Sequence, residues 1–254
     1  MAFSHNCEGF LILSIYMIYW TTISNLGDIA ATAPLAVGIA ILFIVRRAWQ
    51  LAMLWAILFV FGLGLVVVSK IAFVGWGIGH QALDFTGFSG HAMRAMAIFP
   101  VLGYLAAKKN HFSTQITSLV ICTTVGTIVG ISRLLLHVHS WSEVIAGWIL
   151  GAAVSVCFIF LLRNWNNISF YPPLIMVALM PLVITPYLKP TPTQHWIINL
   201  SLYLSGHDQP FTRDDWTHSA LRQAGDVPTI QVKAYSPSSQ VPLSKKIPAI
   251  LSRK

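Results

Sequence analysis

The chain has 254 residues, of which 56% are hydrophobic and only 9% are charged. Soluble globular domains carry about 25% charged residues, so this composition excludes an ordinary soluble domain and indicates a membrane protein. The formal net charge is +8, but the basic residues are spread through short loops and the C-terminal tail, so we interpret them as topology signals and expect no nucleic-acid partner. Three cysteines, Cys7, Cys122 and Cys157, show no paired or zinc-binding spacing.

The first apolar run extends from Phe10 to Trp20. A bilayer crossing needs about 20 apolar residues, and this run is shorter. A signal peptide requires basic residues ahead of its apolar run, whereas the first basic Lys or Arg of this chain is Arg46. We therefore interpret residues 1–25 as an N-terminal interfacial segment whose helix lies at the membrane surface or is partly inserted.

Residues 26–188 are predicted to form a transmembrane domain, an all-α bundle of about six membrane-spanning helices. The predicted spans are Leu26–Val45, Leu51–Lys70, His91–Ala107, Thr114–Ile131, Glu143–Leu162 and Tyr171–Leu188. Asp28 and Pro34 weaken the first span. Several prolines interrupt the last span, and neighbouring helices can satisfy the backbone groups that these prolines leave without hydrogen bonds. Residues 189–254 are predicted to be a polar, partly disordered tail with a small folded element around His195–Leu204.

The loop charges predict an orientation for the bundle. The connections after the first, third and fifth spans contain Arg46, Arg47, Lys108, Lys109 and Arg163. Because positively charged loops stay on the cytoplasmic side, these connections are predicted to face the cytoplasm. The connections after the second and fourth spans, and the tail, then face outward. We expect an integral protein of the bacterial inner membrane with these segments in the periplasm.

Polar residues that are costly in a bilayer gather near the outward-facing ends of the spans. They are Lys70 at the end of the second span; Ser89, Gly90, His91 and Arg94 at the start of the third; Ser132 and Arg133 at the end of the fourth; and His139 and Glu143 at the start of the fifth. Each alone has a structural explanation: Lys70 as an interfacial anchor, Ser89 as an N-cap, and Ser140 with Glu143 as a capping box. Three bases and two histidines together indicate a functional site.

This combination favours binding and cleavage of a phosphate ester. Arginine and lysine neutralise phosphoryl oxygens, and a helix N-terminus with Gly90 at its start offers open backbone N–H groups to an anion. Two histidines can divide the nucleophile and acid roles, with His137 as an alternative to His139. No cluster of Asp and Glu suits magnesium, so we expect neither a metal nor another cofactor.

At these residues the chain resembles the type-2 phosphatidic acid phosphatase superfamily, also called lipid phosphate phosphatases. The third motif of that family is Ser-Arg, five residues, His, three residues, Asp. The stretch SRLLLHVHSWSE places Ser132, Arg133, His139 and Glu143 at those positions. The motif spacing selects His139 over His137 as the counterpart of the family's catalytic histidine.

The resemblance covers roughly Leu26 to Leu188, with three departures from the family pattern. The second motif, Pro-Ser-Gly-His, reads FSGH here and ends at His91. The third motif ends in glutamate in place of aspartate. The first motif, Lys followed after six residues by Arg-Pro, begins at Lys70 but has Gly77 and Ile78 at the Arg-Pro positions.

The missing arginine of the first motif raises the question of what replaces it. Our hypothesis is that Arg94 does, because it lies three residues beyond His91 and both project from one face of a helix. The alternative is that Arg94 only reaches the interface and the protein has lost catalysis.

The resemblance implies that His139 attacks phosphorus, that Glu143 holds its other ring nitrogen, and that His91 protonates the leaving oxygen. It further implies that the phosphoryl oxygens are bound by Lys70, Ser89, Gly90 and Arg133, with Arg94 as the added candidate. The expected function is hydrolysis of a lipid phosphate or diphosphate whose tail stays among the membrane lipids; the sequence predicts no particular protein partner. The alternatives are a lipid phosphotransferase on the same scaffold and a non-catalytic binder of anionic headgroups.

Overall fold

The structure of the protein is a computed structural model that describes residues 2–165 and 193–216, with side chains from residue 14 onward. Within this part the chain is all-helical and contains no strand. The helices are α1 (Ala2–Asn25), α2 (Ile29–Val45), α3 (Trp49–Trp76), the 3-10 helix η1 (Gln81–Leu83), α4 (Gly90–Ala107), α5 (Phe112–Leu135), α6 (Trp141–Arg163) and α8 (Thr193–Ser205). Residues Met1–Arg213 form one compact unit and Asp214–Lys254 a second.

Local sequence signals explain where two of these helices begin and end. Asp28, which we expected to weaken the first span, is instead the N-cap of α2, and its side chain accepts a hydrogen bond from the Ala30 N–H at 2.9 Å. The helix α3 was predicted to end at Lys70 but continues to Trp76, because the apolar residues after Lys70 keep it helical. It ends at Gly77, which has the left-handed φ of 68° that glycine adopts without a Cβ clash.

Four helical segments of the described chain are long and apolar enough to cross a membrane. They are Ser14–Val45, which takes in the end of α1 and all of α2, Trp49–Trp76, Phe112–Leu135 and Trp141–Arg163. These findings support a membrane protein but do not confirm the predicted count of about six spans. The helix α4 is not among the four, because His91 and Arg94 lower its hydropathy. The predicted span Tyr171–Leu188 lies outside the described residues.

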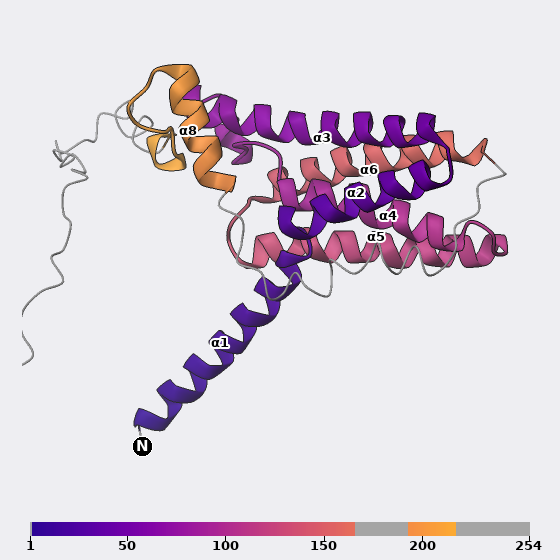
Figure 1. The fold of residues 1–254 in the computed structure, drawn as a ribbon. Helices are drawn as coiled ribbons and strands as arrows, with labels where there is room; N and C mark the ends of the chain where they lie inside the picture. The colour runs from indigo at the N-terminus through magenta and orange to yellow at the C-terminus, as the bar shows by residue number, and fades with distance from the viewer. Residues whose placement is uncertain (1, 166–192, 217–254) are drawn as a thin grey trace, which may run out of the picture. The chain divides into compact units, whose positions relative to one another are not determined.

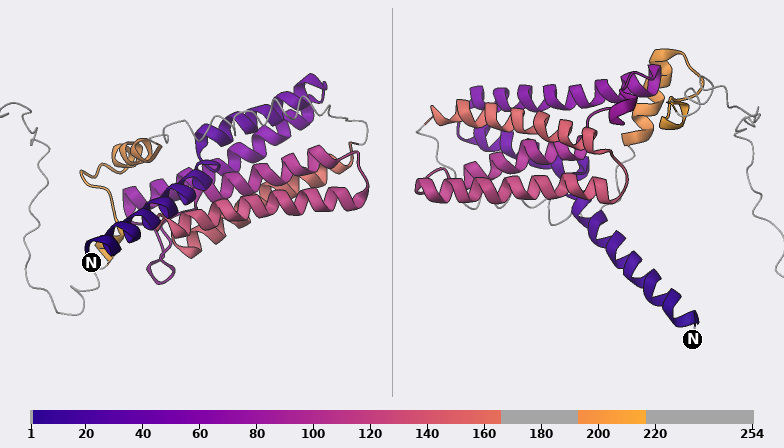
Figure 2. Two further views of the ribbon diagram at one scale, coloured as in Figure 1. Left: turned by 90° about the horizontal axis from the view of Figure 1, so that it is seen from below. Right: turned by 180° about the vertical axis from the view of Figure 1, so that it is seen from behind.

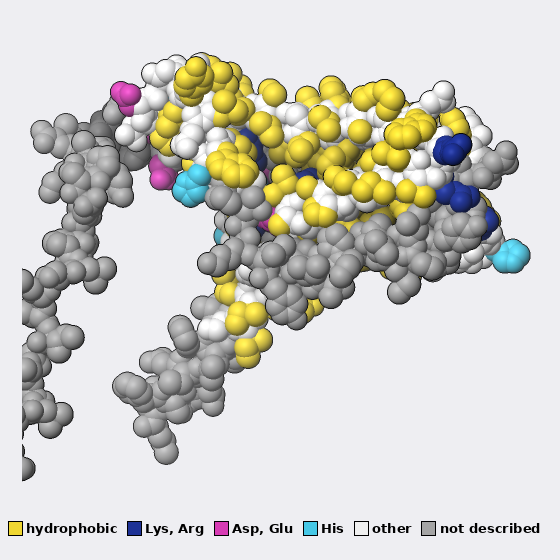
Figure 3. All heavy atoms as spheres, viewed as in Figure 1, with side chains coloured by type: hydrophobic (Ala, Val, Ile, Leu, Met, Phe, Trp, Pro, Cys, Tyr) yellow, Lys and Arg dark blue, Asp and Glu magenta, His cyan; other side chains and the backbone are white. Residues whose placement is uncertain are grey.

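The helices α2 to α6 run alternately in opposite directions (Figures 1 and 2), and the longest connection among them, residues 77–89 between α3 and α4, contains η1. One end of the bundle, here called the basic end, is where α2, α4 and α6 finish. Lys108 ties this end together by donating from Nζ to the carbonyls of Leu162 and Trp165, at 3.2 and 2.8 Å. Figure 3 shows Lys and Arg side chains gathered at this end and hydrophobic side chains along the flank of the bundle.

The opposite end, here called the site end, is where α3 and α5 finish and α4 and α6 begin. The helix α8 lies at this end, because it packs against the last turn of α3. The backbone of Gly75 approaches the Ser201 carbonyl so closely that an added Cβ would stand 3.3 Å from it. The helix α8 confirms the folded element predicted around His195–Leu204.

The helix α4 is the centre of the bundle, and nearly all of its residues are buried. It contacts α5 and α6 more extensively than any other helices contact each other. Small residues permit this close packing: a Cβ added at Gly147 of α6 would lie only 2.7 Å from the Ser89 carbonyl. The start of α4 is thereby fixed against the start of α6.

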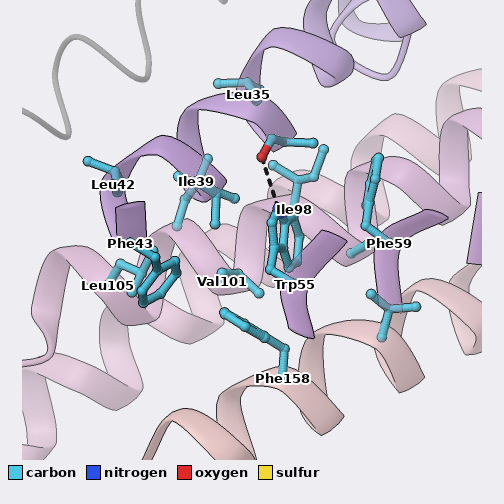
Figure 4. Close-up of a cluster of buried hydrophobic side chains, with 14 of the residues drawn as sticks. Leu35, Ile39, Leu42, Phe43, Trp55, Phe59, Ile98, Val101, Leu105 and Phe158 are labelled. Carbon is cyan, nitrogen blue, oxygen red and sulfur yellow. Dashed lines mark hydrogen bonds between the residues drawn. The ribbon is translucent and has the colours of Figure 1, made fainter. Parts of the chain in front are cut away.

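An aromatic cluster fills the core between α2, α3, α4 and α6 (Figure 4). The Trp55 ring lies 5.2 Å from the Phe158 ring, and Phe158 meets Phe43 edge-on at 5.5 Å. Trp55 also donates from Nε1 to the Ala36 carbonyl at 2.9 Å, so its one polar atom is satisfied. The cluster joins the first two helices of the bundle to the helices that carry the second and third motifs.

Replacing Phe158 with alanine is expected to destabilise the protein by about 3–5 kcal/mol, because it opens a cavity where the ring is 0% exposed. Thermal unfolding in detergent measures this. The matched control is Phe160→Ala on the same helix, whose ring is 65% exposed and whose loss should leave the unfolding temperature nearly unchanged. Equal effects of the two variants would contradict the packing described here.

Candidate active site

The loops at the site end are held together by hydrogen bonds between the start of α6 and the chain before α4. The Ser89 N–H donates to the Glu143 carbonyl at 3.0 Å, and the Thr86 N–H donates to Oε1 of the Glu143 side chain at 2.9 Å. The Phe88 N–H donates to Oγ of Ser69 on α3 at 3.1 Å. The second motif therefore lies against both α3, which carries Lys70, and the start of α6, which carries the last residue of the third motif.

A short hydrogen bond joins the histidine and the acid of the third motif. Nδ1 of His139 lies 2.6 Å from Oε2 of Glu143, whose side chain is only 1% exposed. Glu143 also forms the predicted capping box with Ser140, in which each side chain accepts a hydrogen bond from the other's backbone N–H. One carboxylate thus caps α6 and orients the imidazole, so the predicted capping role of Glu143 is compatible with its predicted role beside His139.

The environment of His139 favours a neutral imidazole. Burial lowers the pKa of His139 below its ordinary value of 6.5, the hydrogen bond to Glu143 raises it, and Lys70 and Arg133 lower it again. The balance of these effects is a lowered pKa, so the ring is neutral at pH 7. Its Nδ1–H then donates to Glu143, which leaves the lone pair on Nε2. His137, by contrast, is exposed and lies in a turn with φ 53°.

Two buried polar groups at the site have no hydrogen-bond partner within the described chain: the Ser89 hydroxyl and Nε of Arg133. Ser89 is the N-cap of α4, but its side chain makes no capping hydrogen bond, so the simple N-cap explanation does not apply. Because an unpaired buried polar group is costly, these two groups indicate a place for a polar ligand. Their motif positions are those that the family resemblance assigns to phosphate binding.

The turn between α1 and α2 lines the other side of the motif residues, a feature that the sequence did not reveal. The Arg133 side chain donates from Nη1 to Oγ of Ser24 at 2.7 Å. Nε2 of His91 lies 3.6 Å from Oδ2 of Asp28. Asp28 therefore has two roles, since one oxygen caps α2 and the other faces the second-motif histidine. The only sequence signal was a carboxylate at the start of an apolar run.

Arg94 is buried beneath this turn. It donates from Nε and Nη2 to the Gly27 carbonyl, at 3.2 and 2.8 Å. Gly90 makes this possible, because a Cβ there would stand 3.0 Å from Nη1 of Arg94. Nη1 of Arg94 thus lies on the side of Gly90 where a side chain would stand, and the expected contact of an anion with the Gly90 N–H stays a prediction. Arg94 thus links α4 to the α1–α2 turn, which is a structural task in addition to any contact with a ligand.

Lys70 lies in the interior of α3, six residues before its last residue. The loop that returns from α3 to α4 packs beside it, and a Cβ added at Gly87 would be 3.3 Å from Cγ of Lys70. Arg94, Glu143 and Arg133 are its charged neighbours. Lys70 is therefore among the motif residues even though the helix does not end there.

Sequence reasoning also missed Thr86 and Arg213. Oγ1 of Thr86 makes a very short hydrogen bond to Oε1 of Glu143. Nη2 of Arg213 lies 2.9 Å from the same oxygen. Neither residue belongs to a motif that we recognised, and Arg213 is 70 residues away from Glu143 along the chain.

The variant Arg94→Ala is expected to lose about 1–3 kcal/mol of stability, because the Gly27 carbonyl loses its buried partner. Thermal unfolding in detergent measures this, with the exposed Arg163→Ala at the basic end as a control. Turnover by the folded variant then tests whether Arg94 also replaces the missing arginine of the first motif. Unchanged turnover would exclude Arg94 as the replacement for the missing arginine, and unchanged stability would contradict its structural role.

Comparisons with known proteins agree with the motifs. A family model described as the PAP2 superfamily matches residues 76–168. An uncharacterized 22.5 kDa protein in the cps region of Klebsiella pneumoniae is 34% identical over 211 residues, which cover 77% of this chain and 96% of that protein. Phosphatidylglycerophosphatase B of Bacillus subtilis (strain 168) is 30% identical over 141 residues, which cover 52% of this chain and 68% of that protein. No solved structure matches the chain. The chain therefore belongs to the PAP2 superfamily, which includes lipid phosphatases.

Proposed function

We propose that the protein is a metal-independent membrane phosphatase that hydrolyses a lipid phosphate or diphosphate through a phosphohistidine intermediate. The observation that carries this proposal is the 2.6 Å contact between His139 and Glu143. It orients a neutral imidazole beside two cationic residues of the motifs, Lys70 and Arg133.

In the first step, Nε2 of His139 attacks phosphorus and forms a P–N bond as the bond from phosphorus to the leaving oxygen breaks. Glu143 accepts the Nδ1–H throughout, which fixes the tautomer and stabilises the positive charge that develops on the ring. In the second step, water attacks phosphorus, the P–N bond breaks, and the neutral imidazole returns. Inorganic phosphate is the product.

His91 is the proposed acid for the leaving oxygen and the base for the attacking water. It is the second residue of α4, at the same end of the bundle as His139. Oδ2 of Asp28 lies 3.6 Å from Nε2 of His91. One histidine is thus paired with Glu143 and the other with Asp28, which supports a division of roles between them.

The proposed phosphate-binding groups are Lys70, Ser89, Gly90 and Arg133, with Arg94 behind them. The unpaired Ser89 hydroxyl and Arg133 Nε support this assignment, because both are buried donors that a phosphoryl oxygen would satisfy. Phosphoryl transfer depends mainly on positioning and charge neutralisation, which these donors would supply in the proposed metal-independent reaction.

A lipid substrate is supported by the place of the site at one end of a membrane-embedded bundle. We place the site at headgroup level, where the phosphate of a lipid would meet it while the lipid tail remains in the bilayer. The name of the similar Bacillus protein, phosphatidylglycerophosphatase B, also favours a lipid phosphate. From the basic residues at the opposite end, we propose that the site end and the tail face the periplasm.

A non-catalytic binder of anionic headgroups is the second candidate. The observation that favours it is Gly77, which stands where the family's first motif has arginine. Loss of one charge-stabilising group commonly lowers turnover by about 10²–10³-fold, so binding could outlast catalysis.

The purified protein is expected to release inorganic phosphate from one or more lipids in a panel of phosphatidic acid, phosphatidylglycerol phosphate and polyprenyl diphosphate, with a chelator present. His139→Ala should abolish release, and rapid acid-free quenching should trap phosphate on His139. The control is His137→Asn, because asparagine tolerates the left-handed backbone at that position. Binding of the lipids without any release would favour the headgroup binder, and release that depends on an added acceptor lipid would favour the phosphotransferase.

The pH dependence of kcat should reflect the lowered pKa of His139. The neutral ring attacks, so activity is lost as the pH falls through its pKa, and the acid limb should lie below pH 6.5. Because the hydrogen bond to Glu143 raises this pKa, Glu143→Gln should move the limb to still lower pH while reducing kcat. An acid limb well above pH 6.5 would contradict His139 as the nucleophile.

A further inference from the structure

Arg213 enters the site from a part of the chain outside the family-matched residues 76–168. It follows α8, which itself packs on α3. Nη2 of Arg213 lies 2.9 Å from Oε1 of Glu143, and Nε lies 3.0 Å from Oδ1 of Asp84. The guanidinium therefore bridges the α3–α4 loop and the acid of the third motif.

The segment that carries Arg213 is fixed to the end of α3 by backbone contacts. The His207 ring donates from Nδ1 to the Gly75 carbonyl at 2.7 Å, and the Phe211 N–H donates to the Val74 carbonyl at 2.9 Å. The Phe211 ring packs on Gly77, where a Cβ would stand 3.0 Å from it. Gly77 is the position at which the family's first motif has arginine, so the segment with Arg213 is seated where that side chain is missing.

The two oxygens of the Glu143 carboxylate have separate partners. Oε2 accepts from His139 Nδ1 and from the Ser140 N–H. Oε1 accepts from the N–H and Oγ1 of Thr86 and from Arg213. Since the side chain is 1% exposed, these donors hold the ionised carboxylate in place of water. Arg213 is the one that brings a full positive charge.

Glutamate has one more rotatable bond than the aspartate of the family motif, so its carboxylate needs more contacts to keep one orientation. The orientation matters, because Oε2 must stay in line with Nδ1 of His139 for the opposite nitrogen to face phosphorus. An arginine bonded to Oε1 restricts rotation of the carboxylate about its last bond. The planar guanidinium contacts Asp84 as well as Glu143, so it holds the Glu143 carboxylate in one orientation.

We propose that Arg213 is a positioning residue for the reaction: it fixes the Glu143 carboxylate and, through it, the tautomer and direction of the His139 imidazole. The role of the imidazole as nucleophile rests on the proposed function, whereas the positioning itself does not. The C-terminal segment is then part of the active site, and a chain ending after α6 would have an incompletely ordered histidine.

The first test needs no substrate. In the full-length protein with ¹⁵N-labelled histidine, His139→Ala identifies the Nδ1–H resonance of His139, which a 2.6 Å hydrogen bond shifts downfield. In Arg213→Gln this resonance should move upfield or broaden by exchange with water, and Arg213→Lys should restore it partly. Arg163→Gln, an exposed arginine at the basic end, is the matched control. An unchanged resonance in a folded Arg213→Gln protein would overturn the proposal.

The second test uses turnover of the lipid phosphate that the wild-type protein hydrolyses best. Arg213→Gln should lower kcat by about 10- to 100-fold, the size expected for a misplaced reacting group, with KM within twofold of wild type. In a Glu143→Gln background, Arg213→Gln should lower kcat by less than twofold. An equal loss in both backgrounds, or a change in KM alone, would overturn the positioning role. If no lipid is hydrolysed by the wild type, the proposed function fails, while the resonance test still decides whether Arg213 orders His139.

Discussion

The site end of this protein is organised around one buried carboxylate, that of Glu143. A buried ionised group is destabilising unless hydrogen bonds and opposite charge replace its lost hydration. Glu143 obtains these from the backbone at Ser140, the Thr86 loop, the His139 ring and Arg213. These partners come from three separate stretches of chain, which are residues 139–140, Thr86 and Arg213, so satisfying one charge fixes their positions relative to one another.

This constraint explains why a single residue serves structure and chemistry together. The capping box requires the carboxylate at the first turn of α6, and the imidazole pair requires it four residues after His139. Both conditions are met by the same side chain, because the turn before α6 places residue 139 beside the helix start. The proposed nucleophile, His139, is therefore oriented before a substrate arrives, which is the form of preorganisation that the proposed phosphoryl transfer needs.

Much of the fold and part of the site could be predicted from sequence, because those features depend on local pattern. Apolar runs located the helices α2 to α6 to within a few residues at most ends, and the motif spacing distinguished His139 from His137, which is exposed. The end of α3 was misplaced because Lys70 was assumed to mark the interface. Asp28 and Arg213 could not be found, since their relation to the site exists only after distant segments have packed against it.

The extension of α3 beyond Lys70 also bears on how deep the site lies. At 1.5 Å per residue, six further residues put Lys70 about 9 Å below the end of the helix. The chain must therefore turn back toward Lys70 before α4 begins, and Gly87 is found packed against that lysine. Lys70 consequently lies below the end of α3, at the level of the loop that precedes α4. A phosphate bound in the proposed way would meet a lower dielectric at this depth than in bulk water, which would strengthen each of its contacts with a cation. The depth of Lys70 therefore bears on the proposal that a site without the first-motif arginine still holds a phosphate.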